Sequence, residues 1–354
     1  MLLRRIAFQM IFLALVSLAT HAQAFKSLTY IDKVPVPHNE VNGSFAIRLP
    51  TKCGPDGTIY VRFAGMDREP ALNLIRQDGK LASSIRLNEV HELWENHLDD
   101  FAPGDGEVFV LSKRGKRHAP TTYYISRFKI DGTYVSSAKL DTDFRPDFEP
   151  KQIAAFPSGE LLIAGMAKGH DVPFVPFTAI FGANGEFQRE VGLKSDVNEK
   201  HAKGEPSNAG LSPAEQMQYL LDVTYLQTAD DGNIYLMRHT PSGPVFVVSP
   251  GGSVRKVALV PPIEGAVLQW IMSSQGSIAA HYISVDAKKG KTHYLTIVDA
   301  WTGKSRETIQ YKHDYQTNGS GMVCYRNGAF TFLAGTSDNK VQLVESDPSI
   351  EYAC

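Results

Sequence analysis

The stretch Pro55–Val61 reads PDGTIYV, a tight turn that ends in glycine and is followed at once by an alternating apolar strand. Variants of this phrase recur five more times along the 354-residue chain. They read GDGEVFV at 104–110, PSGELLI at 157–163, DDGNIYL at 230–236, SQGSIAA at 274–280 and RNGAFTF at 326–332. A supersecondary unit that recurs six times predicts a repeat architecture before any single residue is interpreted.

The spacing of these units predicts their size. Successive turn glycines lie 44 to 53 residues apart in four of the five intervals, close to the length of a four-stranded propeller blade, about 40–50 residues. A second glycine turn, such as RQDGK at 76–80 or KIDGT at 129–133, follows most of the first ones. Asp-Gly between alternating apolar runs favours a hairpin. In the second unit we therefore expect strands at about 97–102, 107–112, 123–130 and 133–140.

We predict an all-β fold: a six-bladed β-propeller of four-stranded blades, in one domain over residues 25–354. One unit cannot bury both faces of its sheet, whereas six units packed in a ring can, and ring closure leaves few exposed strand edges. A β-solenoid or a pair of sandwiches is the alternative. The strand-like segment Ser27–Val36 is expected to complete the last blade beside Ser349–Cys354.

The succession of turn glycine, IYV-like strand, short loop and second Asp-Gly turn resembles the NHL-type six-bladed propellers of secreted bacterial proteins. The resemblance covers about Asn42 to the C-terminus. Units four, five and six depart from the pattern: Gln275 and Asn327 replace the turn aspartate, and the last unit lacks a clean second glycine turn. The resemblance implies a fold and not a reaction, because such propellers include binding scaffolds, lyases and lactonases.

Residues 1–24 are expected to be a secretory signal peptide. Arg4 and Arg5 precede a mostly apolar run at 6–18, and Ala22-Gln23-Ala24 matches an A-x-A cleavage signal. An uncleaved membrane anchor is the alternative. We therefore predict export to the periplasm or the extracellular space, with no membrane span after cleavage. The formal net charge of −2 and the lack of a basic stripe argue against a nucleic-acid partner.

The chain has three cysteines, Cys53, Cys324 and Cys354, and an odd number leaves at least one of them unpaired within the chain. Cys53 and Cys324 each lie four residues before the turn glycine of their unit, the first and the last. Those units are neighbours in a closed ring, so a Cys53–Cys324 disulfide would fasten the ring where it closes. Pairing of Cys354 with either cysteine is the alternative.

The longest interval between units carries an insertion at about 194–221. Its first part is polar, and Ser212-Pro213-Ala214-Glu215 then combines a capping serine, a proline in the first turn and a glutamate three residues after the serine, which predicts the start of a short helix. The insertion could cover a central site as a lid or rim, together with the loops at 118–122 and 169–176. The alternative is a decoration packed on its own blade.

Four inner strands place a polar side chain at one level, ten residues before their turn glycine: Asn96, Glu149, Asp222 and Asn318. Asparagine and carboxylate oxygens are ligands that calcium prefers, and the set resembles the calcium site at the channel mouth of lactonase-type propellers. In that interpretation His97 is a candidate general base. The alternative is that such residues are common at strand starts, and that a one-residue slip in the alignment turns every side chain to the other face.

These patterns lead to two hypotheses about function. The first is an exported scaffold that binds an unidentified protein, peptide or carbohydrate through the channel mouth and the insertion-bearing rim. The alternative is a calcium-dependent hydrolase of the lactonase or esterase type with its site at the channel mouth. No nucleophile elbow, Walker loop or HExxH motif is present.

Overall fold

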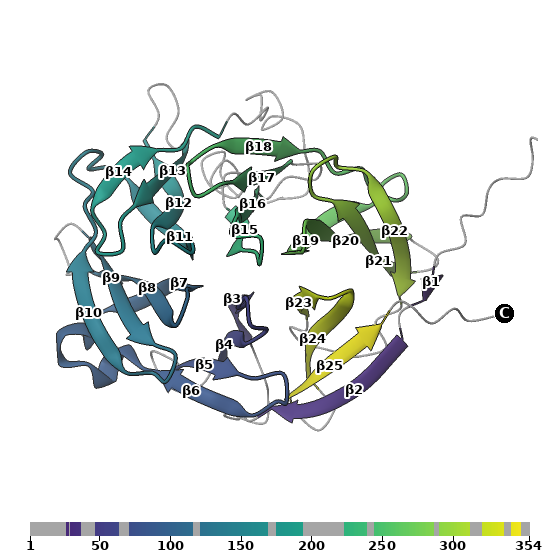
Figure 1. Cartoon of the computed structure of the whole chain (residues 1–354), viewed down its shortest axis with the longest axis horizontal. Helices are drawn as coiled ribbons and strands as arrows, with labels where there is room; N and C mark the ends of the chain where they lie inside the picture. Colours follow the sequence, from purple (N-terminus) through teal and green to yellow (C-terminus); the bar gives the residue numbers. More distant parts are fainter. Residues whose placement is uncertain are drawn as a thin grey trace, which may run out of the picture.

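The computed structural model describes residues 26–27, 29–36, 47–63, 71–115, 121–168, 175–193, 223–238, 244–286, 290–311, 321–335 and 341–347. Its strands form six antiparallel sheets arranged as blades around a central axis (Figure 1). The prediction of a six-bladed, all-β propeller is therefore confirmed. The predicted signal peptide at 1–24, the predicted insertion at 194–221 and Cys354 lie outside the described residues.

The first three blades follow the chain from the innermost strand outward. Blade 1 is β3 (Ile47–Cys53), β4 (Ile59–Phe63), β5 (Leu72–Ile75) and β6 (Leu81–Ile85). Two short 3-10 helices, η1 (Leu87–Glu89) and η2 (His91–Leu93), lead to the next blade. Blade 2 is β7 (His97–Pro103), β8 (Glu107–Arg114), β9 (Thr122–Lys129) and β10 (Tyr134–Lys139). Blade 3 is β11 (Glu149–Ala155), β12 (Leu161–Ala167), β13 (Val175–Phe181) and β14 (Phe187–Glu190).

The other three blades repeat this order. Blade 4 is β15 (Val223–Thr228), β16 (Ile234–Arg238), β17 (Val245–Val248) and β18 (Val254–Val257). Blade 5 is β19 (Val267–Ser274), β20 (Ser277–Asp286), β21 (Gly290–Asp299) and β22 (Ser305–Tyr311). Blade 6 is β23 (Gly321–Arg326), β24 (Ala329–Gly335) and β25 (Val341–Asp347), completed by β2 (Thr29–Val36) from the start of the chain.

The N-terminal segment closes the ring. β2 pairs antiparallel with β25, from Thr29 opposite Asp347 to Val36 opposite Val341, and β1 (Lys26–Ser27) pairs parallel with the outer strand of blade 5. The expected role of Ser27–Val36 in the last blade is thus confirmed, but its expected partner was wrong. The partner is Val341–Asp347, and Ser349–Cys354 lie outside the described residues. The last unit lacks the second glycine turn that marks the fourth strand elsewhere, so the sequence placed the partner too late.

Deletion of residues 25–36 should leave the ring open. The backbone N–H and C=O groups of β25 would lose the ladder that β2 provides, and an unpaired strand edge recruits other chains. We expect faster amide hydrogen exchange across 341–347 and dimers or larger species on size-exclusion chromatography. A monomeric variant with unchanged protection of β25 would contradict this closure.

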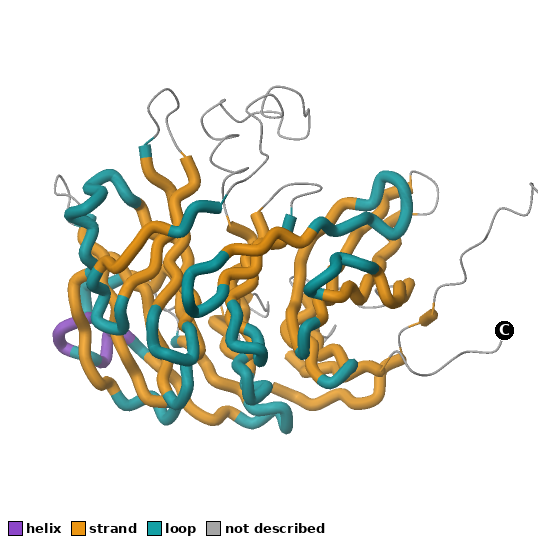
Figure 2. Tube along the Cα trace, turned by 45° about the horizontal axis from the view of Figure 1, so that its top comes forward, coloured by secondary structure: helices purple, strands orange, loops and turns teal. Residues whose placement is uncertain are grey.

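The connections divide the ring into two ends. The turns between first and second strands and between third and fourth strands lie at one end, here called the turn end; the remaining connections lie at the other, the loop end (Figure 2). The strands that flank 116–120, 169–174 and 194–222 all stop at the loop end. The strands that flank the predicted rim segments therefore all end at the same end of the ring.

The departures at Gln275 and Asn327 are a shorter type of turn. Gln275 has φ 49° and Gly276 has φ 69°, and Asn327 and Gly328 repeat this pair of positive values at 53° and 83°. Two successive residues with positive φ form a type I′ turn, whose twist matches that of a two-residue hairpin. In blades 5 and 6 the inner hairpin is therefore tighter than elsewhere.

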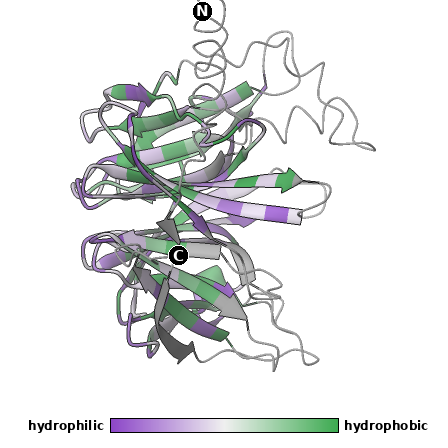
Figure 3. Ribbon diagram, turned by 90° about the vertical axis from the view of Figure 1, so that its right-hand side faces the viewer, coloured by the Kyte–Doolittle hydropathy of each residue, from purple (hydrophilic) through white to green (hydrophobic). Residues whose placement is uncertain are grey.

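The hydrophobic core lies between neighbouring blades. Apolar and polar residues alternate along several strands (Figure 3), so each sheet presents apolar side chains to the blades beside it. The closing contact is built in this way too: Ile59 and Val61 of blade 1 form one buried cluster with Leu333 and Leu343 of blade 6. The ring closes by packing as well as by strand pairing.

Every inner strand carries a register shift against its neighbour. The shifts fall between Leu98 and Asp100 in β7, between Pro150 and Gln152 in β11, and within each of the other four inner strands. A bulge of this kind turns the side chains beyond it relative to those before it. It separates the turn-end half of each inner strand from its loop-end half.

In the described part of the chain, no helix has the length and apolar character needed to cross a membrane.

Candidate functional site

The structure places only part of the predicted calcium set. Asn96 and Glu149 lie at the loop-end starts of β7 and β11, while Asp222 and Asn318 lie outside the described residues. The Asn96 side chain is buried; its amide donates to Ser112 Oγ at 3.0 Å, and its oxygen accepts from Arg114 Nε at 2.9 Å. This amide therefore ties the start of β7 to β8.

Glu149 and His97 are more exposed to solvent than Asn96. Glu149 Oε2 lies 3.3 Å from Lys151 Nζ on the same strand, and His97, the first residue of β7, is partly exposed. Among the described residues, no three histidine, cysteine, aspartate or glutamate side chains gather as a metal site. The calcium site and the catalytic role of His97 remain predictions from the sequence.

A buried lysine occupies the centre of the ring at the turn-end half. Lys52 Nζ donates to Asp100 Oδ2, to the carbonyl of Phe101 and to the carbonyl of Ile153, each at 2.7 Å. Asp100 Oδ2 also accepts from the backbone N–H of Ile153 at 2.8 Å. Lys52 thereby joins blades 1, 2 and 3, and an ammonium group has three N–H donors, all of which are used here.

Burial acts against both charges of this pair. The side chains of Lys52 and Asp100 are 4% and 0% exposed. Loss of hydration lowers the pKa of Lys52 and raises the pKa of Asp100, while their mutual attraction opposes both shifts. The use of all three lysine donors favours the charged form, since a neutral amine has only two N–H groups to offer.

A glutamine reaches across the axis from the opposite blade. Gln227 of blade 4 donates through Nε2 to the carbonyl of Cys53 and accepts from the Cys53 N–H at 3.4 Å. Thr228 beside it donates to the carbonyl of Ala155 in blade 3. The inner strand of a blade presents unpaired backbone groups toward the axis, and buried backbone groups need partners. Side chains from other blades supply those partners.

The remaining blades are joined at the turn end. Asp230 of blade 4 accepts from Ser274 Oγ at 2.8 Å and from the Gln275 N–H at 2.6 Å in blade 5. Gln275 Nε2 in turn donates to Asn327 Oδ1 of blade 6 at 2.7 Å. Tyr225 OH lies 3.5 Å from the hydroxyl of Ser273. Polar side chains thus connect blade 4 to 5 and blade 5 to 6.

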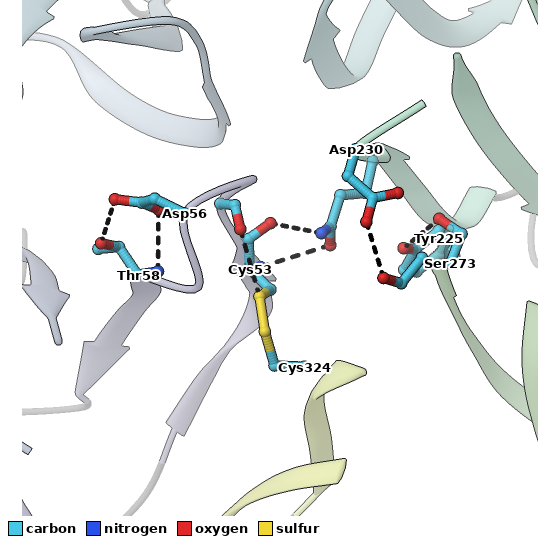
Figure 4. The surroundings of a disulfide bond; sticks show 10 residues. Cys53, Asp56, Thr58, Tyr225, Asp230, Ser273 and Cys324 are labelled. Atoms are coloured by element: carbon cyan, nitrogen blue, oxygen red, sulfur yellow. Dashed lines mark hydrogen bonds between the residues drawn. A yellow bond between two sulfur atoms is a disulfide. The ribbon is translucent and has the colours of Figure 1, made fainter. Parts of the chain in front are cut away.

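A disulfide completes the circle. Cys53 of blade 1 is bonded to Cys324 of blade 6, with their Cα atoms 5.3 Å apart (Figure 4). Both cysteines are buried. This is the pairing that would fasten the ring where it closes. Side-chain bonds therefore join blade 3 to 4, 4 to 5, 5 to 6 and 6 to 1, and Lys52 joins blade 1 to blades 2 and 3.

Little space is left between these groups. A cavity of about 20 Å³ is lined by residues of blades 1, 4, 5 and 6, among them Cys53, Gln227, Asp230 and Arg326. A cavity needs about 10–15 Å³ to hold one water molecule, so this one has room for about one. Among the described residues, Lys52, Gln227 and the two bonded cysteines place their side chains in the turn-end half of the axis.

The loop end carries an exposed tryptophan. Trp94 lies on the connection from blade 1 to blade 2 and is 66% exposed. Exposed Glu92 and Glu95 flank it in the chain. Trp301 is 77% exposed in the turn between β21 and β22, at the turn end, where the Arg255 guanidinium stacks over its ring at 4.7 Å. The two indoles therefore mark opposite ends of the ring.

Sequence reasoning missed the residues that fill the axis. Lys52, Asp100 and Gln227 were not among the predicted site residues. A signal was present: Lys52 and Gln227 each stand five residues before their turn glycine, at 57 and 232. A polar side chain at the same level of two inner strands predicts a contact near the axis, and the level chosen, ten residues before the glycine, lies beyond the bulges.

Comparison with known proteins adds little. No protein-family model and no curated protein sequence matches the chain, so the resemblance to NHL-type propellers stays a prediction. A protein of unknown function from Bacteroides caccae aligns with a TM-score of 0.46 and 14% identity over 78% of this chain and 86% of its own. A subtype N10 neuraminidase-like protein of an isolate from a little yellow-shouldered bat aligns with a TM-score of 0.45 and 10% identity, over 90% of this chain and 99% of its own. The protein YCF48, solved with a bound D1 peptide, aligns with a TM-score of 0.41 and 10% identity, over 94% of this chain and 100% of its own. Likeness at this level carries no argument about function.

Proposed function

We propose that the protein is an exported binding scaffold that holds a protein or peptide partner at the loop end of its ring. The observation that carries this proposal is the filled axis. Lys52, Gln227 and the Cys53–Cys324 disulfide occupy the turn-end half of the axis, and the cavity beside Cys53 and Gln227 measures about 20 Å³. A ring closed in this way offers its outer surface, rather than an internal chamber, for recognition.

The loop end is the better surface of the two. The turn end consists of tight glycine turns that are joined to one another by Asp230, Gln275 and Asn327. The loop end collects the longer connections, and in rigid scaffolds recognition residues concentrate on such connections. Tryptophan is enriched among the residues that dominate binding energy at protein interfaces. Trp94 is therefore the described residue that we place in the interface.

The disulfide supports the exported location. Disulfide bonds between buried cysteines persist in oxidising compartments and are rare in the cytosol. Cys53 and Cys324 are both buried and bonded to each other. Together with the predicted signal peptide at 1–24, this supports a site of action outside the cytoplasm.

The test compares the two exposed tryptophans. A photoreactive phenylalanine analogue at position 94 should crosslink the chain to one defined protein in its native host, because that position would lie in the interface. The same analogue at position 301, which is equally exposed but at the other end, should not. With the purified partner, Trp94→Ala should weaken binding by about 2 kcal/mol or more, and Trp301→Ala should leave it unchanged. Equal crosslinking from both positions, or from neither, would refute the loop-end interface.

The calcium-dependent hydrolase stays a prediction from the sequence. The Asn96 oxygen accepts from Arg114, and two of the three other proposed ligands, Asp222 and Asn318, lie outside the described residues. No observation on the described residues favours that function over the scaffold.

A further inference from the structure

Two histidines on adjacent strands of blade 5 point their ring nitrogens at each other. His281 lies on β20 and His293 on β21, two positions apart in the ladder: His281 is opposite Leu295, and His293 is opposite Ile283. Side chains two residues apart on a strand share a face, so both imidazoles stand on the same face. The distance from His281 Nε2 to His293 Nδ1 is 3.0 Å, and the rings lie 12° from parallel.

This separation is close to that of two ligands on one metal ion. Zinc–nitrogen bonds measure about 2.0–2.1 Å, so two imidazole nitrogens on a tetrahedral ion lie about 3.3–3.4 Å apart. To bind one ion, the two nitrogens must move a few tenths of an ångström apart, and each ring must turn so that its nitrogen faces the ion instead of the other ring. Both strands lie inside the sheet of blade 5, paired on each side. The backbone therefore keeps the two histidine residues next to each other before any ion arrives.

The pair is also within reach of solvent. Both imidazoles are half-buried, and the hairpin continues beyond them to an exposed end, where Val285 is 70% exposed. An ion can therefore enter from solvent and keep water in its remaining positions. Imidazole suits copper, nickel and zinc, whereas calcium and magnesium prefer oxygen ligands. We infer that His281 and His293 form a two-imidazole binding site for a divalent transition-metal ion of the copper, nickel or zinc class.

The inference is independent of the proposed scaffold function and is tested with the metal alone. Copper(II) is titrated into the mature chain, prepared without a polyhistidine tag, and binding is followed by calorimetry. We expect one tight site per chain. His281→Gln and His293→Gln should each weaken it by about 100-fold, because a second ligand held in place adds about that factor or more over a single one. His91→Gln, which removes a single exposed imidazole, should leave the affinity unchanged.

A spectrum of the unaltered protein keeps the test independent of variant folding. Electron paramagnetic resonance of the copper-loaded chain should show coupling to nitrogens from two imidazoles, and added calcium should not displace the ion. The inference is overturned if the unaltered chain binds copper no more tightly than the double variant His281→Gln/His293→Gln. It is also overturned if the spectrum shows one nitrogen ligand or none.

Discussion

Replacement of Lys52 by methionine should destabilise the protein by about 3–5 kcal/mol, the usual result of removing one partner from a buried ion pair. The change leaves the Asp100 carboxylate, 0% exposed, without its cation, and it leaves the carbonyls of Phe101 and Ile153 without their donor. Urea unfolding of the mature chain measures the loss. Replacing both charges, in Lys52→Met/Asp100→Leu, should recover part of it, because no unpaired buried charge remains.

The matched control is an ion pair of the same length at the surface. Lys113 Nζ lies 2.7 Å from Asp99 Oδ1, as Lys52 lies 2.7 Å from Asp100, but the Lys113 side chain is 42% exposed. Lys113→Met should therefore change the stability by no more than about 1 kcal/mol. Equal losses from Lys52→Met and Lys113→Met would show that burial of the central pair does not set its contribution.

The Lys52→Met variant should also respond to pH in a defined direction. Burial raises the pKa of Asp100 above the value of about 3.9 for an unfolded aspartate, while Lys52 lowers it. The variant lacks the lysine, so its folded Asp100 should have a higher pKa than Asp100 of the unaltered chain. A group with a raised folded pKa stabilises the fold at low pH, and this contribution is lost as the pH rises through the folded value. Urea midpoints at pH 5 and pH 8 should therefore show a smaller gap between variant and unaltered chain at pH 5. A gap that grows on acidification would contradict this assignment.

Removal of the disulfide should have an effect of similar size. Cys53 and Cys324 are 271 residues apart in sequence, so their bond restricts almost the whole unfolded chain. Chain-entropy estimates for loops of this length reach about 5 kcal/mol, and removal of a native disulfide typically costs about 2–5 kcal/mol. We expect Cys53→Ala/Cys324→Ala to melt at a lower temperature, and the unaltered chain to lose the same stability in reductant.

The third cysteine provides the control. Cys354→Ala removes a thiol that has no part in the Cys53–Cys324 bond, so its melting temperature should equal that of the unaltered chain, and reductant should lower both alike. If Cys354→Ala were as unstable as the double variant, the bond would involve Cys354 in solution.

The propeller fold could be predicted because its sequence signals are local. Each Gly-containing turn and the alternating strand after it depend on a few consecutive residues, so the six blades can be read from phrases such as Pro55–Val61. The second blade follows this pattern closely: the strands expected at about 97–102 and 107–112 are His97–Pro103 and Glu107–Arg114. Only where a local signal was missing, at the fourth strand of the last blade, did the prediction place a partner too late.

The centre of the ring could not be predicted because its contacts are not local. Lys52 and Asp100 are 48 residues apart, and Gln227 and Cys53 are 174 apart. A lysine in an alternating strand ordinarily indicates a solvent-facing position. The bulges in the inner strands are a second reason. They change which face a side chain occupies between the turn glycine and the level of Asn96 and Glu149. An alignment by sequence spacing alone counts through these bulges as if the strands were regular.

The side chains along the axis also determine how wide the ring can be. Lys52 spans from its own blade to two others, and Gln227 meets the blade that faces it (Figure 1). Covalent bond lengths fix these reaches, and a hydrogen bond weakens steeply once its atoms move apart. A seventh blade would enlarge the bore and separate every one of these partners. Duplication of a single repeat, the step by which repeat proteins commonly lengthen, would therefore disrupt this protein at its centre. The lengths of the Lys52 and Gln227 side chains thus fit a ring of six blades.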